Sequence, residues 1–371
     1  MHANHRQILT EVLSLPTAPF AEGVVIDYVR QFCRRRRVLS LTEDRAGNLL
    51  VRYRRGRATV KHPVCLTAHL DHPGFVAEQM TGPGRLRAVW RGGVRPEYFV
   101  GASVRFWVDG HWVRGVIQTI RVRGRGREAR VQTAGIAVAA TVPPAAVGMW
   151  DLPDPRIDSR FIRARGCDDM AGAAALLCCL DDLCRRKPSG EVYFLFTRGE
   201  EVGFIGAIAA CRLKTIPARC LVVAVEMSPE LPSARIGDGP VLRVGDRSSV
   251  FTPALTAFCR SVADALAKRD KSFTYQRKLM DGGTCESSAY CELGYPATGI
   301  CLPLGHYHNM DLKRQRIAAE YVSTRDFENL VKWFAALVES RRAYAGHDAA
   351  FRERLGSLER QYAKLLKATR P

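Results

Sequence analysis

The order of apolar and polar residues along the chain predicts a protein that alternates helices with short buried strands. Amphipathic segments at residues 6–14 and 20–35 are typical of helices, and apolar runs at 38–42, 48–53 and 63–68 are typical of strands. This alternation is the pattern of an α/β domain.

The pattern changes between about residue 76 and about residue 153. Apolar and polar residues alternate there in short runs that glycines separate. We expect an inserted all-β module, a small barrel of roughly six or more short strands. Its clearest strands are predicted at 86–90, 103–108, 112–118 and 130–133.

The α/β pattern returns after the insertion and continues almost to the end of the chain. Helices are expected at 173–184, 253–268 and 323–341, and buried strands at 192–196, 220–225, 241–244 and 297–302. A charged segment then carries an apolar seam with a residue spacing of 4, 3, 4 and 3, which is typical of an amphipathic helix. The seam consists of Phe351, Leu355, Leu358, Tyr362 and Leu365. It packs either on its own chain or on a second subunit, and the sequence leaves both open.

Composition narrows the class of protein. The chain has 371 residues, of which 47% are hydrophobic and 25% charged, as in globular enzymes. No stretch approaches the roughly 18 apolar residues of a membrane helix, and the first residues lack the apolar core of a signal peptide. The 12 cysteines are scattered and form no pair of Cys-x-x-Cys motifs. We therefore expect a cytoplasmic protein with reduced thiols and no membrane partner.

The formal net charge of +19 raises the question of nucleic-acid binding. The densest basic runs lie at 34–37, 52–57 and 121–127. None of them alternates with aromatic residues, as a surface that stacks on bases would. Nucleic acid is therefore not the expected partner.

Two adjacent carboxylates, Glu200 and Glu201, directly follow the buried strand at 192–196. Buried neighbouring acids repel each other unless a cation compensates them. Further candidate metal ligands follow other strands or open the next helix, and they are His69, Asp168, Glu226 and His308. Each has an ordinary explanation by itself, such as a helix cap or an arginine partner. Their coincidence in one α/β domain favours a metal site, because open sheets place ligands at the carboxyl ends of strands.

Six short motifs, taken in order, make the chain resemble a known family. The motifs are Ala68-His69-Leu70-Asp71 with Gly74-Phe75, Asp168-Asp169-Met170-Ala171-Gly172, Glu200-Glu201-Val202-Gly203, Gly239-Pro240-Val241, Gly282-Gly283-Thr284 and Tyr307-His308. The sequence resembles, from about Leu13 to Leu337, the cytosolic dinuclear-zinc aminopeptidases that include glutamyl aminopeptidase and tetrahedral aminopeptidase.

The resemblance implies two divalent metal ions, zinc by preference and cobalt or manganese as alternatives. It assigns His69, Asp168 and Glu226 to one ion. It assigns Asp168, Glu201 and His308 to the other, so that Asp168 bridges the pair. It makes Glu200 the general base and Asp71 the carboxylate that fixes the tautomer of His69. The chemistry agrees, because zinc accepts imidazole and carboxylate ligands and a free glutamate can take a proton from an activated water.

Several residues depart from the pattern of the family. Glu226 stands where aspartate is usual, and Asp169-Met170 stands where Asn-Arg is usual. Cys285, followed by Glu286, replaces a usual aspartate and is either a pocket residue or a buried thiol. His306 is expected to support the metal site without binding a metal.

The resulting prediction is an α/β zinc-exopeptidase domain with a mixed sheet and helices on both faces, formed by residues 1–75 and 155–342. A small all-β barrel occupies 76–154, and the amphipathic helix lies within 343–371. The expected function is an aminopeptidase that hydrolyses peptides and assembles as a homo-oligomer.

Two other functions were weighed against this prediction. A carboxypeptidase or N-acyl amino acid deacylase of the wider group usually carries its extra domain after the last acidic ligand. Here the insertion lies between His69 and Asp168. A non-catalytic basic binding protein is disfavoured because the ligands and the base are all present.

Overall fold

The fold is built on an eight-stranded mixed sheet, in a computed structural model that describes residues 1–56, 61–340 and 343–370. The four central strands, β12, β3, β13 and β16, run parallel, and antiparallel strands flank them on both sides. In spatial order the strands are β1 (Leu39–Glu43), β2 (Leu49–Arg55), β12 (Gly190–Thr197), β3 (Val64–His69), β13 (Leu221–Pro229), β16 (Ala297–Leu304), β14 (Val241–Asp246) and β15 (Gln276–Met280). The predicted mixed sheet is confirmed.

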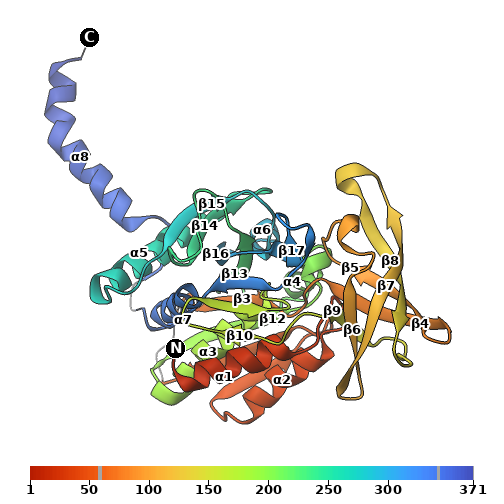
Figure 1. Cartoon of the computed structure of the whole chain (residues 1–371). Helices are drawn as coiled ribbons and strands as arrows, with labels where there is room; N and C mark the ends of the chain where they lie inside the picture. Colours follow the sequence, from red (N-terminus) through yellow and green to blue (C-terminus); the bar gives the residue numbers. More distant parts are fainter. Residues whose placement is uncertain (57–60, 341–342, 371) are drawn as a thin grey trace.

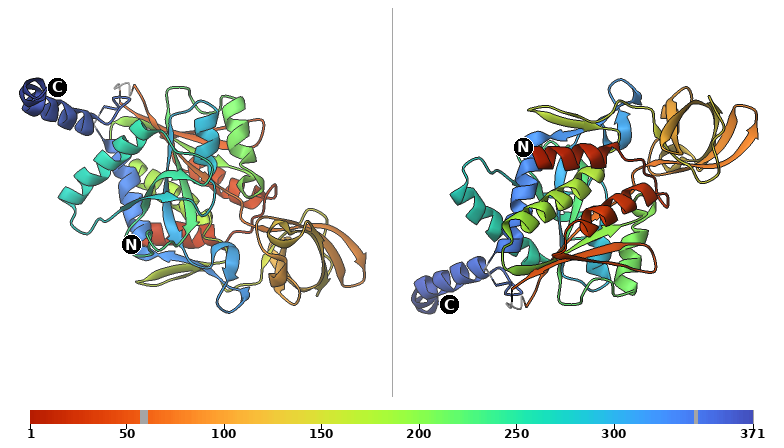
Figure 2. Two further views of the ribbon diagram at one scale, coloured as in Figure 1. Left: turned by 90° about the horizontal axis from the view of Figure 1, so that it is seen from above. Right: turned by 90° about the horizontal axis from the view of Figure 1, so that it is seen from below.

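Helices cover both faces of this sheet, which is why its central strands are apolar throughout instead of alternating. In β12, Phe194 and Phe196 point into one core, and Tyr193 and Leu195 point into the other. The first face carries α1 (Ala3–Ser14), α2 (Gly23–Arg34), α3 (Met170–Arg186), α5 (Pro253–Arg269) and α7 (Thr324–Glu339), several of which stand in front of the sheet in Figure 2, right. The second face carries α4 (Ile205–Arg212) and α6 (Glu286–Glu292).

The inserted module is a closed six-stranded barrel beside the α/β domain, as predicted (Figure 1). Aromatic rings fill it: the ring centroids of Phe75 and Trp90 lie 4.6 Å apart, and those of Phe99 and Trp150 lie 5.2 Å apart. Around the barrel the strands are β4 (Gly74–Gly82), β5 (Arg85–Arg91), β8 (Arg130–Val138), β7 (His111–Arg123), β6 (Ser103–Val108) and β9 (Val147–Trp150). Two short 3₁₀ turns, η1 (Pro96–Tyr98) and η2 (Gly126–Glu128), connect them.

Two small sheets join the elements near the end of the α/β domain. One consists of β10 (Arg156–Ile157), β11 (Phe161–Ala164) and β19 (Glu320–Ser323), and the other of β17 (Met310–Asp311) and β18 (Arg316–Ile317). The sequence pattern did not predict these short strands, because strands of two to four residues carry too few positions to show alternation. No helix among the described residues is both long and apolar enough to span a lipid bilayer.

The last helix, α8 (Ala349–Ala368), projects away from the rest of the molecule (Figure 1). None of its residues is buried, so the seam is not covered by its own chain in this structure. Its start is held in place: Asp348 accepts a hydrogen bond from the Phe351 N–H and pairs with Arg260 of α5 at 2.6 Å.

Candidate metal centre

The predicted ligands meet at the carboxyl ends of the central strands. His69 is the last residue of β3, and Glu226 lies in the second half of β13. Glu200 and Glu201 lie in the 3₁₀ turn η3 (Glu200–Val202) that follows β12. Asp168 lies just before α3, and His308 lies in η4 (Tyr307–Asn309), which follows β16. Neighbouring parallel strands end at one edge, so residues far apart in sequence converge there.

Asp168 stands between two groups of ligands. Its Oδ1 lies 3.4 Å from His69 Nε2, and its Oδ2 lies 3.5 Å from His308 Nε2. His69 Nε2 is also 3.9 Å from a carboxylate oxygen of Glu226, and His308 Nε2 is 3.2 Å from one of Glu201. Donor atoms that share one tetrahedral zinc ion lie about 3.3 Å apart, given bonds of about 2.0–2.1 Å. The spacing therefore suits two ions that share Asp168.

The electrostatics of this cluster call for cations. Burial disfavours the charged carboxylates and, together with neighbouring acids, raises the pKa of Glu226 and of Glu200 well above the usual range. Burial alone would lower the pKa of His69, but the charge of Glu200 and other acids raises it. Asp168 Oδ1 and Glu201 Oε1 are buried and have no hydrogen-bond donor. Divalent cations would supply the missing partners and replace the bound protons.

Both histidines present Nε2 to the cluster because Nδ1 is engaged elsewhere. Nδ1 of His69 donates to the backbone carbonyl of Asp71 at 2.9 Å. Nδ1 of His308 donates to the carbonyl of Gly93 at 3.1 Å, and Gly93 follows the barrel strand β5. A hydrogen bond at one ring nitrogen fixes which nitrogen remains free for a metal. The barrel thus orients one of the predicted ligands.

The role predicted for Asp71 toward His69 stays a prediction, and the structure shows further contacts of this residue. Its carboxylate lies 3.6 Å from His69 Nδ1, and the carbonyl of the same residue takes the hydrogen bond instead. The carboxylate accepts the backbone N–H groups of Glu200 and Glu201, both at 3.0 Å. The Asp71 carboxylate therefore fixes the backbone of the Glu-Glu turn. These two hydrogen bonds join residues far apart in the sequence, so only the tertiary structure reveals them.

Asp168 is held by two residues, Glu320 and His72, that the sequence pattern did not single out. The buried carboxylate of Glu320, in β19, accepts the N–H of Cys167 at 2.6 Å and of Asp168 at 3.0 Å. Nδ1 of His72 donates to the Asp168 carbonyl at 2.6 Å, and its Nε2 lies 3.0 Å from Asn309 Oδ1. His72 follows the Ala-His-Leu-Asp motif directly, which was the only local signal for it.

Asp169, where the family usually has asparagine, is fully buried. Burial raises the pKa of its carboxyl, which favours the neutral form, and a neutral carboxyl resembles an asparagine amide. The side chain lies against Gly172, where an added Cβ would stand 2.0 Å from Asp169 Oδ1. The small residue at this point of the motif is therefore required by the buried acid.

The remaining residues singled out in the sequence have structural partners. Cys285 is buried, its pKa is raised to about 12 by burial, and its backbone N–H donates to Asp246, so it is the buried thiol of the two alternatives. Burial raises the pKa of Glu286 to about 7, and the Tyr290 hydroxyl donates to its carboxylate at 3.3 Å. His306 Nδ1 donates to the carbonyl of Ala319, which lies between β18 and β19.

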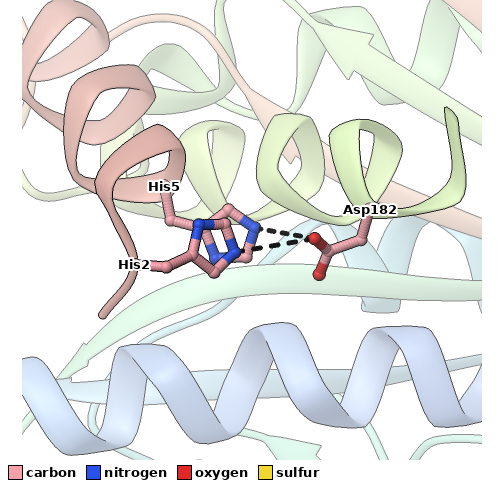
Figure 3. Close-up of side chains that lie close together, drawn as sticks. All are labelled: His2, His5 and Asp182. Atoms are coloured by element: carbon pink, nitrogen blue, oxygen red, sulfur yellow. Dashed lines mark hydrogen bonds and ion pairs between the residues drawn. The ribbon is translucent and has the colours of Figure 1, made fainter. Parts of the chain in front are cut away.

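A third group of possible ligands, His2, His5 and Asp182, lies where α1 meets α3 (Figure 3). His5 Nε2 is 3.1 Å from Asp182 Oδ1, and His2 Nε2 is 3.7 Å from the same atom. The Arg185 guanidinium contacts both His2 Nε2 and the Asp182 carboxylate. This guanidinium already neutralises the Asp182 carboxylate. The group therefore serves to hold the start of α1 on α3.

An α/β sheet that gathers two histidines and four carboxylates at its strand ends has the architecture of a metallopeptidase. Residues 47–332 match the family described as M42 glutamyl aminopeptidase. This match covers most of the chain, so the protein belongs to that family of peptide-bond hydrolases, and its resemblance to it is confirmed.

Relatives and solved structures agree with this assignment. The chain is 26% identical over 307 residues to a protein of Acetivibrio thermocellus named as an aminopeptidase, covering 78% of this chain and 85% of the relative. An aminopeptidase of Desulfurococcus kamchatkensis has a TM-score of 0.73 at 22% identity, covering 91% of this chain and 94% of that one. The TET1 peptidase of Pyrococcus horikoshii has a TM-score of 0.72 at 21% identity, covering 90% and 99%. At these identities the structures show the shared fold.

The two backbone contacts of Asp71 generate a prediction. Asp71→Asn replaces one acceptor oxygen by an amide that cannot accept, so the Glu-Glu turn loses one of its two anchors. We expect peptide hydrolysis to fall by about 10–100-fold, the usual effect of losing a residue that orients metal ligands. The measurement is kcat/KM with an aminoacyl p-nitroanilide.

Asp326→Asn is the matched control. Asp326 is also buried and accepts two backbone N–H groups, from Gly237 at 2.7 Å and Gly239 at 3.0 Å, but it touches no predicted ligand. Both variants should lower the melting temperature, and only Asp71→Asn should lower kcat/KM. Equal losses of activity in both would assign Asp71 to general stability.

Proposed function

We propose that the chain is a dinuclear metallo-aminopeptidase in which Asp168 bridges two divalent ions, zinc by preference. The observation that carries the proposal is the opposed placement of the two Asp168 oxygens, one beside each histidine. His69, Asp168 and Glu226 would hold one ion, and Asp168, Glu201 and His308 the other. Bound ions of this kind supply an activated water and polarise the peptide carbonyl.

The residues of the chain then divide the remaining work. Glu200 lies beside the cluster with a carboxylate oxygen 3.9 Å from His69 Nε2, and its raised pKa suits a group that takes and returns a proton. It would accept the proton of the attacking water and return it to the leaving amine. Asp71 and Glu320 would keep Glu200 and Asp168 in position through their backbone contacts.

A narrow cavity with room for about one water molecule lies beside Glu226. Its lining includes Ser228, Arg243, Thr284 and Tyr307. We also propose that the enzyme works in the cytoplasm, because all 12 cysteines are free thiols and most are buried.

The general experiment compares substrates that separate the candidate activities. Purified protein loaded with Zn²⁺, Co²⁺ or Mn²⁺ is given aminoacyl amides, their N-acetylated counterparts, N-acyl amino acids and N-blocked peptides. We expect hydrolysis only where the α-amine is free, and its loss with a chelator. Release of acyl groups, or of C-terminal residues from N-blocked peptides, would instead identify a deacylase or a carboxypeptidase.

Glu200→Gln tests the assignment of the two glutamates. The amide keeps the size of the side chain but cannot take a proton, so kcat should fall by about 10²–10⁴-fold or more. Metal content, measured by mass spectrometry of the dialysed protein, should stay at two ions per chain. Near-normal kcat, or the loss of one ion, would show that Glu200 is not the base.

Glu226→Ala tests the longer acidic ligand. We expect about one tightly bound metal ion per chain in place of two, because only one of the proposed sites uses Glu226. Glu191→Ala is the control: Glu191 is also buried in this sheet, but its carboxylate pairs with Arg52 and Arg219 at 2.6 and 2.8 Å. Two tight ions in both variants would remove Glu226 from the ligand set.

We further propose a homo-oligomer. The Pyrococcus horikoshii TET1 peptidase is described as assembling into a tetrahedron or a large octahedral shell, and a related structure contains a dodecamer. This chain shares their fold. The proposal concerns the body of the protein and is separate from the role of α8.

A further inference from the structure

Helix α8 lies outside the part of the chain that defines the family. The family match ends at residue 332, and α8 begins at Ala349. Its 20 residues form a rod about 30 Å long that extends from the molecule in both views of Figure 2. A free helix of this length is marginal in water, so a covering partner is needed for it to be stable.

Five exposed apolar residues of α8 form one narrow seam, and a sixth, Leu366, lies beside it and is 76% exposed. Phe351 is 54% exposed, Leu355 49%, Leu358 40%, Tyr362 51% and Leu365 59%. Their spacing places Leu355 and Tyr362 at a positions of a heptad and the other three at d positions. Five of the six exposed apolar residues thus lie at a and d positions, and Leu366 lies at the adjoining e position. An apolar face this narrow fits the matching seam of another helix, because a flat protein surface would need a wider one.

We propose that α8 pairs with α8 of a second copy of this chain as an antiparallel two-helix coiled coil. With the two-fold axis between Gly356 and Ser357, Leu355 packs against Leu358 of the second copy. Phe351 of each copy packs against Tyr362 of the other copy, so this contact occurs twice, on either side of the two-fold axis. Arg352 and Glu359 both occupy e positions, and in this register each Arg352 meets Glu359 of the other copy.

Charge favours the antiparallel direction over the parallel one. The second half of the tail carries Arg360, Lys364, Lys367 and Arg370 but only one acid, Glu359. A parallel pair would bring two such basic ends together, whereas an antiparallel pair places them at opposite ends. Because Asp348 ties the start of α8 to Arg260, an antiparallel pair also places the two bodies at opposite ends of the rod.

This contact does not depend on the proposed catalysis. The seam belongs to a helix with no buried residue, and none of its residues lies in the metal centre. Variants on α8 should therefore leave kcat/KM unchanged, so a failed pairing experiment and a failed activity experiment cannot be confused.

The first experiment compares two double variants that add the same charge. Leu355→Glu/Leu358→Glu puts carboxylates into the seam, and Ser357→Glu/Ala363→Glu puts them on the opposite face. Each full-length protein, and a chain ending at Ala345, is followed by analytical ultracentrifugation over a dilution series. We expect the concentration for half-dissociation of the α8 contact to rise at least tenfold in the seam variant. The opposite-face variant should match the wild type, and the shortened chain should match the seam variant.

Identical dilution behaviour of the wild type and the seam variant would overturn the proposal. If neither self-associates through α8, a different protein covers the seam, and the pairing of two copies is wrong.

A charge exchange tests the direction of the pair. Arg352→Glu should weaken association, because it places two glutamates opposite each other, and Arg352→Glu/Glu359→Arg should restore it. In a parallel pair, Arg354 at a g position would face Glu359 instead. The antiparallel arrangement would therefore be wrong if Arg352→Glu/Glu359→Arg does not restore self-association and Arg354→Glu/Glu359→Arg associates as tightly as the wild type.

Discussion

The mutual repulsion of buried carboxylates is the constraint on which the rest of this structure depends. Asp168, Glu200, Glu201 and Glu226 meet two imidazoles, His69 and His308, in one buried cluster. Such a cluster is unfavourable by itself, and protons or cations must balance it. The surrounding structure is accordingly specialised to hold these side chains in place and to leave their oxygen atoms free for cations.

That support comes from backbone contacts more than from side-chain pairs. Asp71 receives two N–H groups of the Glu-Glu turn, and Glu320 receives two N–H groups of the loop that carries Asp168. Both supporting carboxylates use hydrogen bonds that compensate their own burial. Asp168, Glu200 and Glu201 are thereby positioned through the main chain, and the buried Asp168 Oδ1 and Glu201 Oε1 accept no hydrogen bond.

The barrel and the tail extend this core in different ways. The barrel is tied to the chemistry, since the Gly93 carbonyl orients His308 across the boundary between the two units. Helix α8 has no such connection, and among the described residues its one ion pair to the body is made by the residue that caps it, Asp348, with Arg260. The first addition therefore completes the site, and the second offers a surface for association.

Local pattern was enough to predict the longer elements and to single out the candidate ligands. The apolar runs predicted β12, β13 and β16, the 4-3-4-3 spacing predicted α8, and the strand-end positions pointed to His69, Glu201 and His308. Periodicity and burial are properties of neighbouring residues, so a single sequence displays them. The roles of Asp71, Glu320 and Gly93 were decided only by the tertiary structure. Glu320 and Asp168 are 152 residues apart, and His308 and Gly93 are 215 apart, so no local pattern could announce that these groups share hydrogen bonds.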